Sequence, residues 1–502
     1  MASSLRGQMG ILFIGRAMAF ALTFAVPLVL VRIFTPELFG LYKQLFLIYS
    51  TFTAMLTFGF SASLFYFLPK YPAERNAYVF QTLLVLSTVG VLGGALLFIF
   101  RESIALGLNN PALSSYMPYL AIFIVLSLVS ELLETLMLTL KQTAWAAATC
   151  FASELFRGSL MIAAAVLTHS IMILLLAGVV WSGCRLLALL IFLRKQPLPV
   201  WITPSPGRLA GQFKYAIPFG MALIVRTLTD ALPQFAVSYF YDPVVFAIYS
   251  VGYLQIPAVS IAADSIADIT LLKLTELRNA DSIDGCIEVL GGSVVKLCLV
   301  LFPLYIWLMV SAGDLIVLLF TNKFEASIDI FRIFLTTIPL TAIALDYVPR
   351  AFADTAFVLR VNILRIVVTL LLLLALLPPF GLMGAAVATV LGIAITKISI
   401  LVKVKEFVKS DLKSFLPWRR IAKIATAAGS AGLVSLLLQA TFALPLVIRL
   451  GLSATLFSIS YGALVWNAHV LDQTEKDTIL GWLQKCVGTN KYTLRFRLRR
   501  SI

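Results

Sequence analysis

The chain has 502 residues, of which 60% are hydrophobic and only 13% are charged. Soluble proteins carry about 25% charged residues, so a set of soluble domains is excluded and lipid must surround most of this chain. The 39 Lys and Arg exceed the 24 Asp and Glu by 15, which we attribute to basic loops that orient membrane helices and contact anionic lipid, not to nucleic-acid binding. Five scattered cysteines and two histidines argue against a metal centre or a disulfide framework.

Apolar runs recur from one end of the chain to the other. A helix needs about 20 apolar residues to cross a bilayer, and fourteen runs reach that length. We therefore predict an all-α polytopic membrane protein with about fourteen transmembrane helices. The predicted spans are 8–33, 40–66, 77–100, 114–140, 143–168, 170–193, 213–238, 243–270, 292–320, 328–350, 356–378, 380–402, 420–440 and 446–468.

The charges of the loops predict the orientation of the helices. With the N-terminus placed in the cytoplasm, the inner segments hold 26 Lys and Arg and the outer loops hold 3. This asymmetry follows the positive-inside rule. We therefore expect a multi-pass protein of the cytoplasmic (inner) membrane with both termini in the cytoplasm.

Two sequence matches at nearly the same offset indicate an internal repeat. Residues 34–42 (FTPELFGLY) align with residues 241–249 (YDPVVFAIY), and residues 154–157 (ELFR) align with residues 362–365 (NILR). Six helices return the chain to the same side of the membrane, so the repeats are expected to be parallel. The predicted domains are an N-lobe with helices 1–6 (1–198), a cytoplasmic linker (199–212), a C-lobe with helices 7–12 (213–404), helices 13 and 14 (405–470) and a basic cytoplasmic tail (471–502).

Three segments resemble a known family. They are residues 32–42 (RIFTPELFGLY) after helix 1, residues 213–220 (FKYAIPFG) opening helix 7, and residues 379–389 (PFGLMGAAVAT) entering helix 12. With fourteen spans and a six-plus-six repeat, they resemble bacterial polysaccharide-biosynthesis flippases for lipid-linked, O-antigen-type oligosaccharides. These belong to the multidrug/oligosaccharidyl-lipid/polysaccharide exporter superfamily.

The resemblance implies a MATE-like arrangement of the lobes and a function in transport. The expected substrate is a polyprenyl-diphosphate-linked oligosaccharide, which would move from the inner to the outer leaflet by alternating access. Polysaccharide polymerases and glycosyltransferases are the expected protein partners. The resemblance also implies that the first helix of each lobe lines a central cleft.

Four arginines fall deep inside predicted spans, where an unpaired charge costs at least about 2.5–3.5 kcal/mol. Glu154 and Arg157 are three residues apart and Arg226 and Asp230 are four apart, so each pair shares a helix face. The pairs can be structural, or the guanidinium groups can bind a diphosphate through their forked donors. The candidate substrate-binding cations are Arg16, Arg157, Arg226 and Arg365.

Acidic residues also occur inside the spans, mainly in their inner halves. They can face water or neighbouring lysines, or they can form an inner gate or a site for a coupling ion, H⁺ or Na⁺. No other cofactor is expected. The candidate gate and ion-coupling residues are Glu131, Glu134, Asp264, Asp268, Glu154 and Asp230.

Two other functions are compatible with parts of this pattern. An ion-coupled multidrug antiporter of the same superfamily would need buried acids, but deep arginines favour an anionic substrate over a cationic drug. A membrane-embedded glycan polymerase or transferase would need a polar catalytic surface, whereas the outer loops are short, and the longest of them, around 101–113 and 321–327, hold no His or acid pair. No phosphate-binding GxxxxGK[ST] motif occurs. We therefore expect a transporter and not an enzyme.

Overall fold

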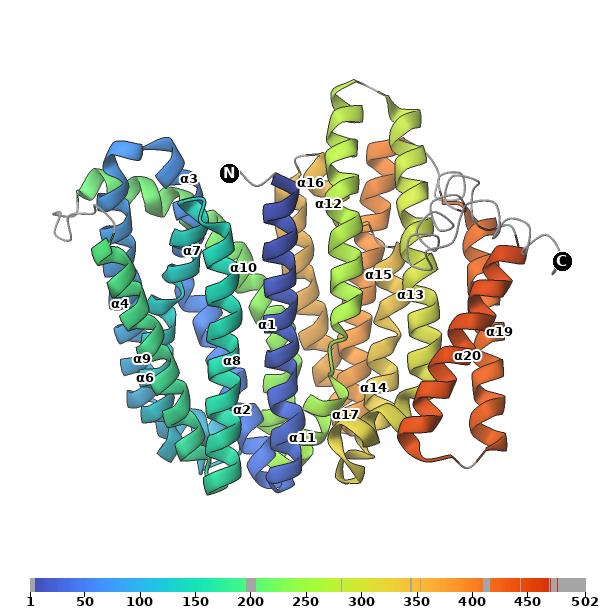
Figure 1. Cartoon of the computed structure of the whole chain (residues 1–502), viewed down its shortest axis with the longest axis horizontal. Helices are drawn as coiled ribbons and strands as arrows, with labels where there is room; N and C mark the ends of the chain where they lie inside the picture. Colours follow the sequence, from blue (N-terminus) through green and yellow to red (C-terminus); the bar gives the residue numbers. More distant parts are fainter. Residues whose placement is uncertain are drawn as a thin grey trace. The chain divides into compact units, whose positions relative to one another are not determined.

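A computed structural model describes most of the chain (Figure 1). The described residues are 5–195, 205–280, 282–343, 345–352, 354–409, 416–442, 444–468, 470 and 476, with the side chains of 5–17, 20, 350 and 355 excepted. These residues form helices and no strand. Most of the predicted basic tail (471–502), part of the predicted linker and the side chain of Arg16 lie outside the described residues.

The helices follow one another with short connections. In chain order they are α1 (Leu5–Ile33), α2 (Pro36–Thr57), α3 (Phe60–Lys70), η1 (Pro72–Glu74), α4 (Arg75–Ile99), α5 (Arg101–Gly107), α6 (Leu113–Ser130), α7 (Leu132–Thr139), α8 (Thr143–Thr168), α9 (Ile171–Lys195), α10 (Pro206–Phe240), α11 (Pro243–Gly252), α12 (Pro257–Asn279), α13 (Ile283–Phe320), η2 (Asn322–Phe324), α14 (Ser327–Leu335), α15 (Thr337–Ile343), α16 (Val348–Ala351), α17 (Thr355–Val408), α19 (Trp418–Thr441) and α20 (Leu446–Asn467). Because α10 begins at Pro206, the second half of the predicted linker forms its first turns.

The helices agree with the predicted membrane spans. In the described part of the chain, ten helices are long and apolar enough to cross a membrane, or eleven if α11 and α12 form one span. The segment Ala356–Val408 contains two predicted spans, because α17 bends at Gly381. The first predicted span corresponds to α1, and the tenth to the short helices α14 and α15. The chain is thus a multi-pass membrane protein, and about fourteen spans are consistent with this structure.

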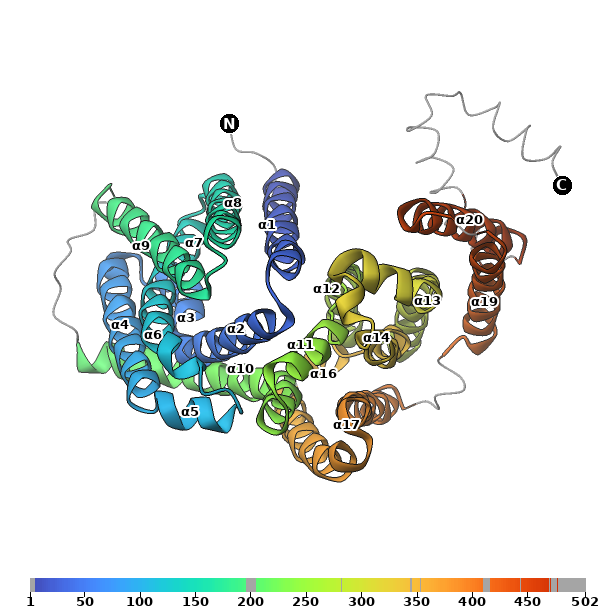
Figure 2. The ribbon, with the colours of Figure 1, turned by 90° about the horizontal axis from the view of Figure 1, so that it is seen from below.

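The described chain divides into two compact units. The first unit contains residues 1–254, 319–334 and 356–396, and the second contains residues 255–318, 335–355 and 397–502. Within the first unit, α4, α6 and α9 lie side by side, and α1 packs along α8 (Figure 2). The predicted division into two six-helix lobes stays a prediction.

The two copies of the repeated motif form the same local structure. Each has a capping residue followed by proline at the first helical position: the Thr35 hydroxyl accepts a hydrogen bond from a backbone N–H of α2, and the Asp242 carboxylate does so in α11. Proline fits there because the first N–H of a helix needs no partner. The copies also meet in space, since a Cβ on Gly40 of the first would collide with the Pro243 backbone of the second.

The chain has positive φ values at a break inside the second predicted span and at the junction of the eleventh and twelfth. The second span breaks at Phe58 and Gly59, which have φ values of 46° and 72° and separate α2 from α3. The break packs closely on α10, because a Cβ on Gly220 would overlap the Phe58 carbonyl. The bend of α17 is at Gly381, with φ 58° and ψ −140°, a conformation that only glycine adopts readily. The break at Phe58 and Gly59 thus lies against α10 within the first unit.

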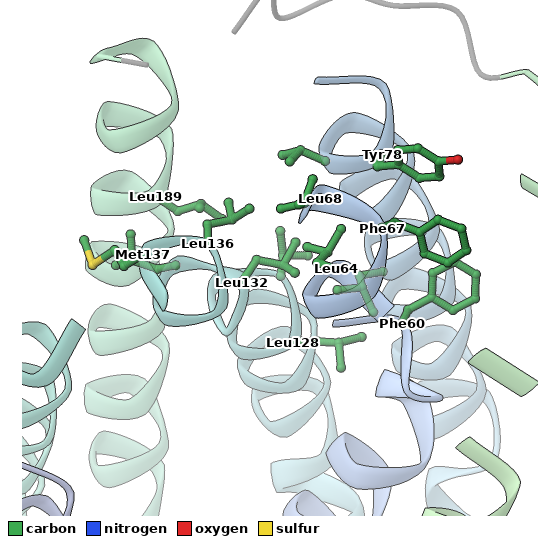
Figure 3. Close-up of a cluster of buried hydrophobic side chains, with 14 of the residues drawn as sticks. Phe60, Leu64, Phe67, Leu68, Tyr78, Leu128, Leu132, Leu136, Met137 and Leu189 are labelled. Atoms are coloured by element: carbon green, nitrogen blue, oxygen red, sulfur yellow. The ribbon is translucent and has the colours of Figure 1, made fainter. Parts of the chain in front are cut away.

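A buried apolar cluster holds α3, α4, α6, α7 and α9 together. Phe60, Leu64 and Phe67 of α3 pack on leucines of α6 and α7, and Leu189 of α9 closes the cluster (Figure 3). In a membrane, such contacts stabilise helix packing through dispersion forces, since lipid is as apolar as leucine. The cluster therefore gives α3 a fixed position in the first unit.

In the second unit, ion pairs join separate helices. Arg449 of α20 forms a bidentate pair with Asp314 of α13, and α19 and α20 lie side by side. Lys397 of α17 pairs with Asp346. Helices α19 and α20, the predicted helices 13 and 14, are therefore anchored to α13 by a charged contact.

Candidate functional site

The first group of charged side chains lies between α10 and α17. Asp230 of α10 pairs with Arg365 of α17, with 2.9 Å between carboxylate oxygen and guanidinium nitrogen. The Arg365 side chain is 14% exposed and that of Asp230 is 40% exposed. The pair joins two helices that are more than a hundred residues apart in sequence, and it neutralises a mostly buried guanidinium.

Arg226, one turn before Asp230 on α10, has no such partner. Its side chain is exposed, and within the described part of the chain it forms neither an ion pair nor a hydrogen bond. The expected pair between Arg226 and Asp230 is therefore wrong, because the carboxylate turns to Arg365 instead. Arg226 is left as a free cation near the middle of a 35-residue helix.

A second group of charged side chains connects α1 and α8. Glu154 and Arg157 form the predicted pair on α8, 2.5 Å apart, and each side chain is 15% exposed. The Thr23 hydroxyl of α1 donates to the Glu154 carboxylate at 2.9 Å and accepts from Arg157 at 3.0 Å. Since the three groups satisfy one another, this cluster has the character of a structural link between helices.

The same group continues onto α9 through an aromatic ring. Both Arg157 and Arg185 lie 5.2 Å from the ring centre of Trp181, within cation–π range. The indole N–H donates to the Ser153 carbonyl at 2.9 Å. Arg185 also pairs with Glu134 at 3.2 Å. Glu134 is therefore part of a connected network that ties α7, α8 and α9 together.

The remaining candidate acids take no part in these ion pairs. Glu131 is exposed and occupies the junction between α6 and α7. Asp264 and Asp268 are exposed on α12 of the second unit. None of the three forms an ion pair in the part of the chain that the structure describes. Arg16 belongs to α1, but its side chain lies outside the described residues.

Sequence reasoning missed several members of these groups. Arg185 is not among the predicted site residues, yet it contacts Glu134 and Trp181. The sequence also gave no indication that Trp181 and Thr23 contact these charged side chains. Only the i,i+3 spacing of Glu154 and Arg157 was visible in the sequence, because the other contacts join distant helices.

The geometry separates satisfied charges from a charge available for binding. Arg157, Arg185 and Arg365 already contact carboxylates, whereas Arg226 presents an exposed guanidinium. Such a group can bind a phosphate through two parallel hydrogen bonds. No group of three or more His, Cys, Asp or Glu residues suited to a metal occurs among the described residues.

Solved structures share this fold. The lipid II flippase MurJ, in an inward closed conformation, aligns over 91% of this chain and 99% of its own, with a TM-score of 0.70 and 14% identity. A multidrug resistance MATE family transporter in an inward-facing conformation aligns over 78% of this chain and 94% of its own, with a TM-score of 0.65 and 11% identity. A transporter from Pyrococcus furiosus, described by the reverse polarity of its binding pocket, aligns over 80% of this chain and 94% of its own, with a TM-score of 0.56 and 11% identity.

The fold therefore defines a class: a polytopic membrane protein with the fold of the lipid II flippase and MATE transporter structures, in agreement with the predicted MATE-like arrangement. No protein of curated function matches the sequence. Residues 29–329 match the model of a family described as polysaccharide biosynthesis protein. The chain belongs to this family.

Proposed function

We propose that this chain is a transporter that flips a lipid-diphosphate-linked oligosaccharide from the inner to the outer leaflet of the cytoplasmic membrane by alternating access. The flipped oligosaccharide would be a building block of a cell-surface polysaccharide. The family supports this proposal through its connection with polysaccharide biosynthesis, and the fold supports it through its likeness to a lipid II flippase. On this proposal both termini are cytoplasmic, and the chain carries no catalytic group.

The observation that carries the proposal is Arg226. A guanidinium in the middle of a membrane helix must face water or a ligand, because hydrocarbon cannot solvate it. Asp230 is engaged by Arg365, so no described carboxylate neutralises Arg226. An exposed cation suits a diphosphate and disfavours a cationic drug, which distinguishes the flippase from a multidrug antiporter.

The charged network of α7, α8 and α9 has a supporting role on this proposal. Arg157 and Arg365 hold carboxylates and position helices, and Arg226 contacts the substrate. Glu131 and Asp264 are exposed and remain the candidate groups for binding a coupling ion, H⁺ or Na⁺. Their role is separable from that of Arg226, since they carry the opposite charge.

The test is glycan export in a strain that lacks this chain and carries a variant instead. Export is normalised to the amount of the variant in the membrane. Arg226→Ala should insert at the wild-type level, since it strands no carboxylate, and should lower export about tenfold or more. Arg226→Lys should also be impaired, because an ammonium cannot form the bidentate contact.

Arg419→Ala is the matched control, because it removes an exposed arginine from α19 and should leave export unchanged. Normal export by Arg226→Ala would refute the substrate role. Poor insertion of Arg226→Ala would instead indicate that Arg226 is a structural residue with a partner.

A further inference from the structure

Three exposed tyrosines gather at one end of α3 and α10. Tyr66 of α3 stacks on Tyr215 of α10, with ring centres 4.7 Å apart and an angle of 11° between the planes. Tyr71 follows α3 directly. The three side chains are 38–44% exposed. The exposed parts of these side chains form an aromatic surface with hydroxyl groups, against which a flat, partly apolar ligand can pack.

Buried aromatic residues fix these rings in place. Phe67 is 7% exposed and contacts Tyr66, Tyr71 and Tyr215, with ring centres 5.1, 6.2 and 5.6 Å away. Phe67 itself belongs to the apolar cluster that includes Tyr78 (Figure 3). The tyrosine surface is therefore attached to the core of the first unit.

Cations accompany the rings. The Lys70 ammonium donates to the Tyr66 hydroxyl at 2.6 Å and lies 4.8 and 5.4 Å from the ring centres of Tyr66 and Tyr71. Lys214, beside Tyr215, is exposed. Hydroxyl and ammonium donors next to aromatic faces suit a ligand that combines apolar C–H faces with hydroxyl groups and a nearby negative charge.

The tyrosine surface shares a helix face with Arg226. Tyr215, Phe219, Ala222 and Arg226 recur at spacings of four, three and four residues on α10, and all four are exposed. Three helical turns, about 16 Å, separate Tyr215 from Arg226. Because Arg226 cannot face hydrocarbon, this stripe of α10 faces water. The rings are thus not placed as an ordinary aromatic belt against lipid.

We propose that Tyr66, Tyr71 and Tyr215, with Lys70, form a platform for the sugar rings of the substrate. This inference rests on the proposed function and adds how the glycan is recognised. Arg226 holds the diphosphate, and the oligosaccharide extends along α10 to the tyrosines, where pyranose C–H faces stack on the rings. Stacking of this kind tolerates differences among sugars, since each pyranose offers an apolar face.

The experiment measures binding of two probes to the purified full-length protein in detergent. One probe is undecaprenyl diphosphate, and the other is undecaprenyl diphosphate carrying a linear tetraglucoside, which is long enough to reach from Arg226 to the tyrosines. Affinities are measured by microscale thermophoresis. The test variant is Tyr66→Ala with Tyr215→Ala, and Tyr66→Phe with Tyr215→Phe keeps both rings. Tyr239→Ala is the control, since Tyr239 is an exposed tyrosine at the other end of α10.

The alanine double variant should bind the tetraglucoside probe about tenfold more weakly, as expected for two aromatic contacts. It should bind undecaprenyl diphosphate as the wild type does. The phenylalanine double variant keeps both rings and should bind the tetraglucoside probe more tightly than the alanine double variant, and Tyr239→Ala should retain wild-type affinity for both probes. Arg226→Ala should weaken binding of both, because it removes the diphosphate contact.

Two results would overturn the platform. The first is normal binding of the tetraglucoside probe by the alanine double variant. The second is an equal loss of affinity for both probes, which is expected if the tyrosines contact the lipid part of the substrate. The proposed function fails separately, if Arg226→Ala changes the affinity for neither probe. Thermal unfolding of each variant identifies any loss of affinity that arises from misfolding.

Discussion

Neutralising Asp230 should destabilise the protein by removing the partner of Arg365. Asp230→Asn keeps the shape of the side chain but leaves the guanidinium without its counter-ion, and that guanidinium is 14% exposed. Breaking a fully buried pair costs about 3–5 kcal/mol. Because Asp230 is 40% exposed, water screens the pair, and we expect a loss of about 2 kcal/mol.

The assay is equilibrium unfolding by SDS in mixed micelles, followed by circular dichroism. A double-mutant cycle with Arg365→Gln should give a coupling energy of about 1–2 kcal/mol, because the second substitution removes the stranded charge. The same cycle with Arg226→Gln should give a coupling near zero. A larger coupling energy between Asp230 and Arg226 than between Asp230 and Arg365 would refute this reasoning. It would indicate that Asp230 pairs with Arg226 on the same helix.

Two further predictions concern packing and topology. Gly40→Ala should destabilise the protein by about 1–3 kcal/mol in the same assay, since its Cβ would collide with the Pro243 backbone. Gly429→Ala is the control and should leave the stability unchanged, because a Cβ there would meet no atom within 4 Å. Equal destabilisation by the two substitutions would contradict the close contact at Gly40. Reporter fusions after Lys141 and Arg420 should read cytoplasmic and one at Asn109 external, given the loop charges. A cytoplasmic signal at Asn109 would overturn the orientation.

The sequence predicted the helices well, because lipid forces each span to be apolar and to satisfy its backbone internally. It did not reveal the break at Phe58 and Gly59, since both lie in an uninterrupted apolar run. Gly59 has left-handed geometry at the point where Gly220 of α10 approaches closely. That contact joins residues far apart in the chain, so the hydropathy pattern cannot predict it.

The sequence pattern identified most of the charged residues of these groups, but it did not identify which of them pair with one another. Periodicity reports neighbours on one helix, which sufficed for Glu154 and Arg157. It suggested the wrong partner for Asp230, because the competing arginine lies on α17. Burial and pairing decide which cation is free, and both depend on tertiary packing that the sequence pattern does not show.

The contact between the two motif copies has a consequence for how this chain can evolve. In a symmetric dimer of identical halves, both copies of an interface must carry the same residues. Here the first copy has Gly40, which meets Pro243, whereas the equivalent position of the second copy has Ala247. A single chain that holds both motifs is free of the dimer's constraint, so each position can change independently, and the two positions do differ, with glycine in one motif and alanine in the other.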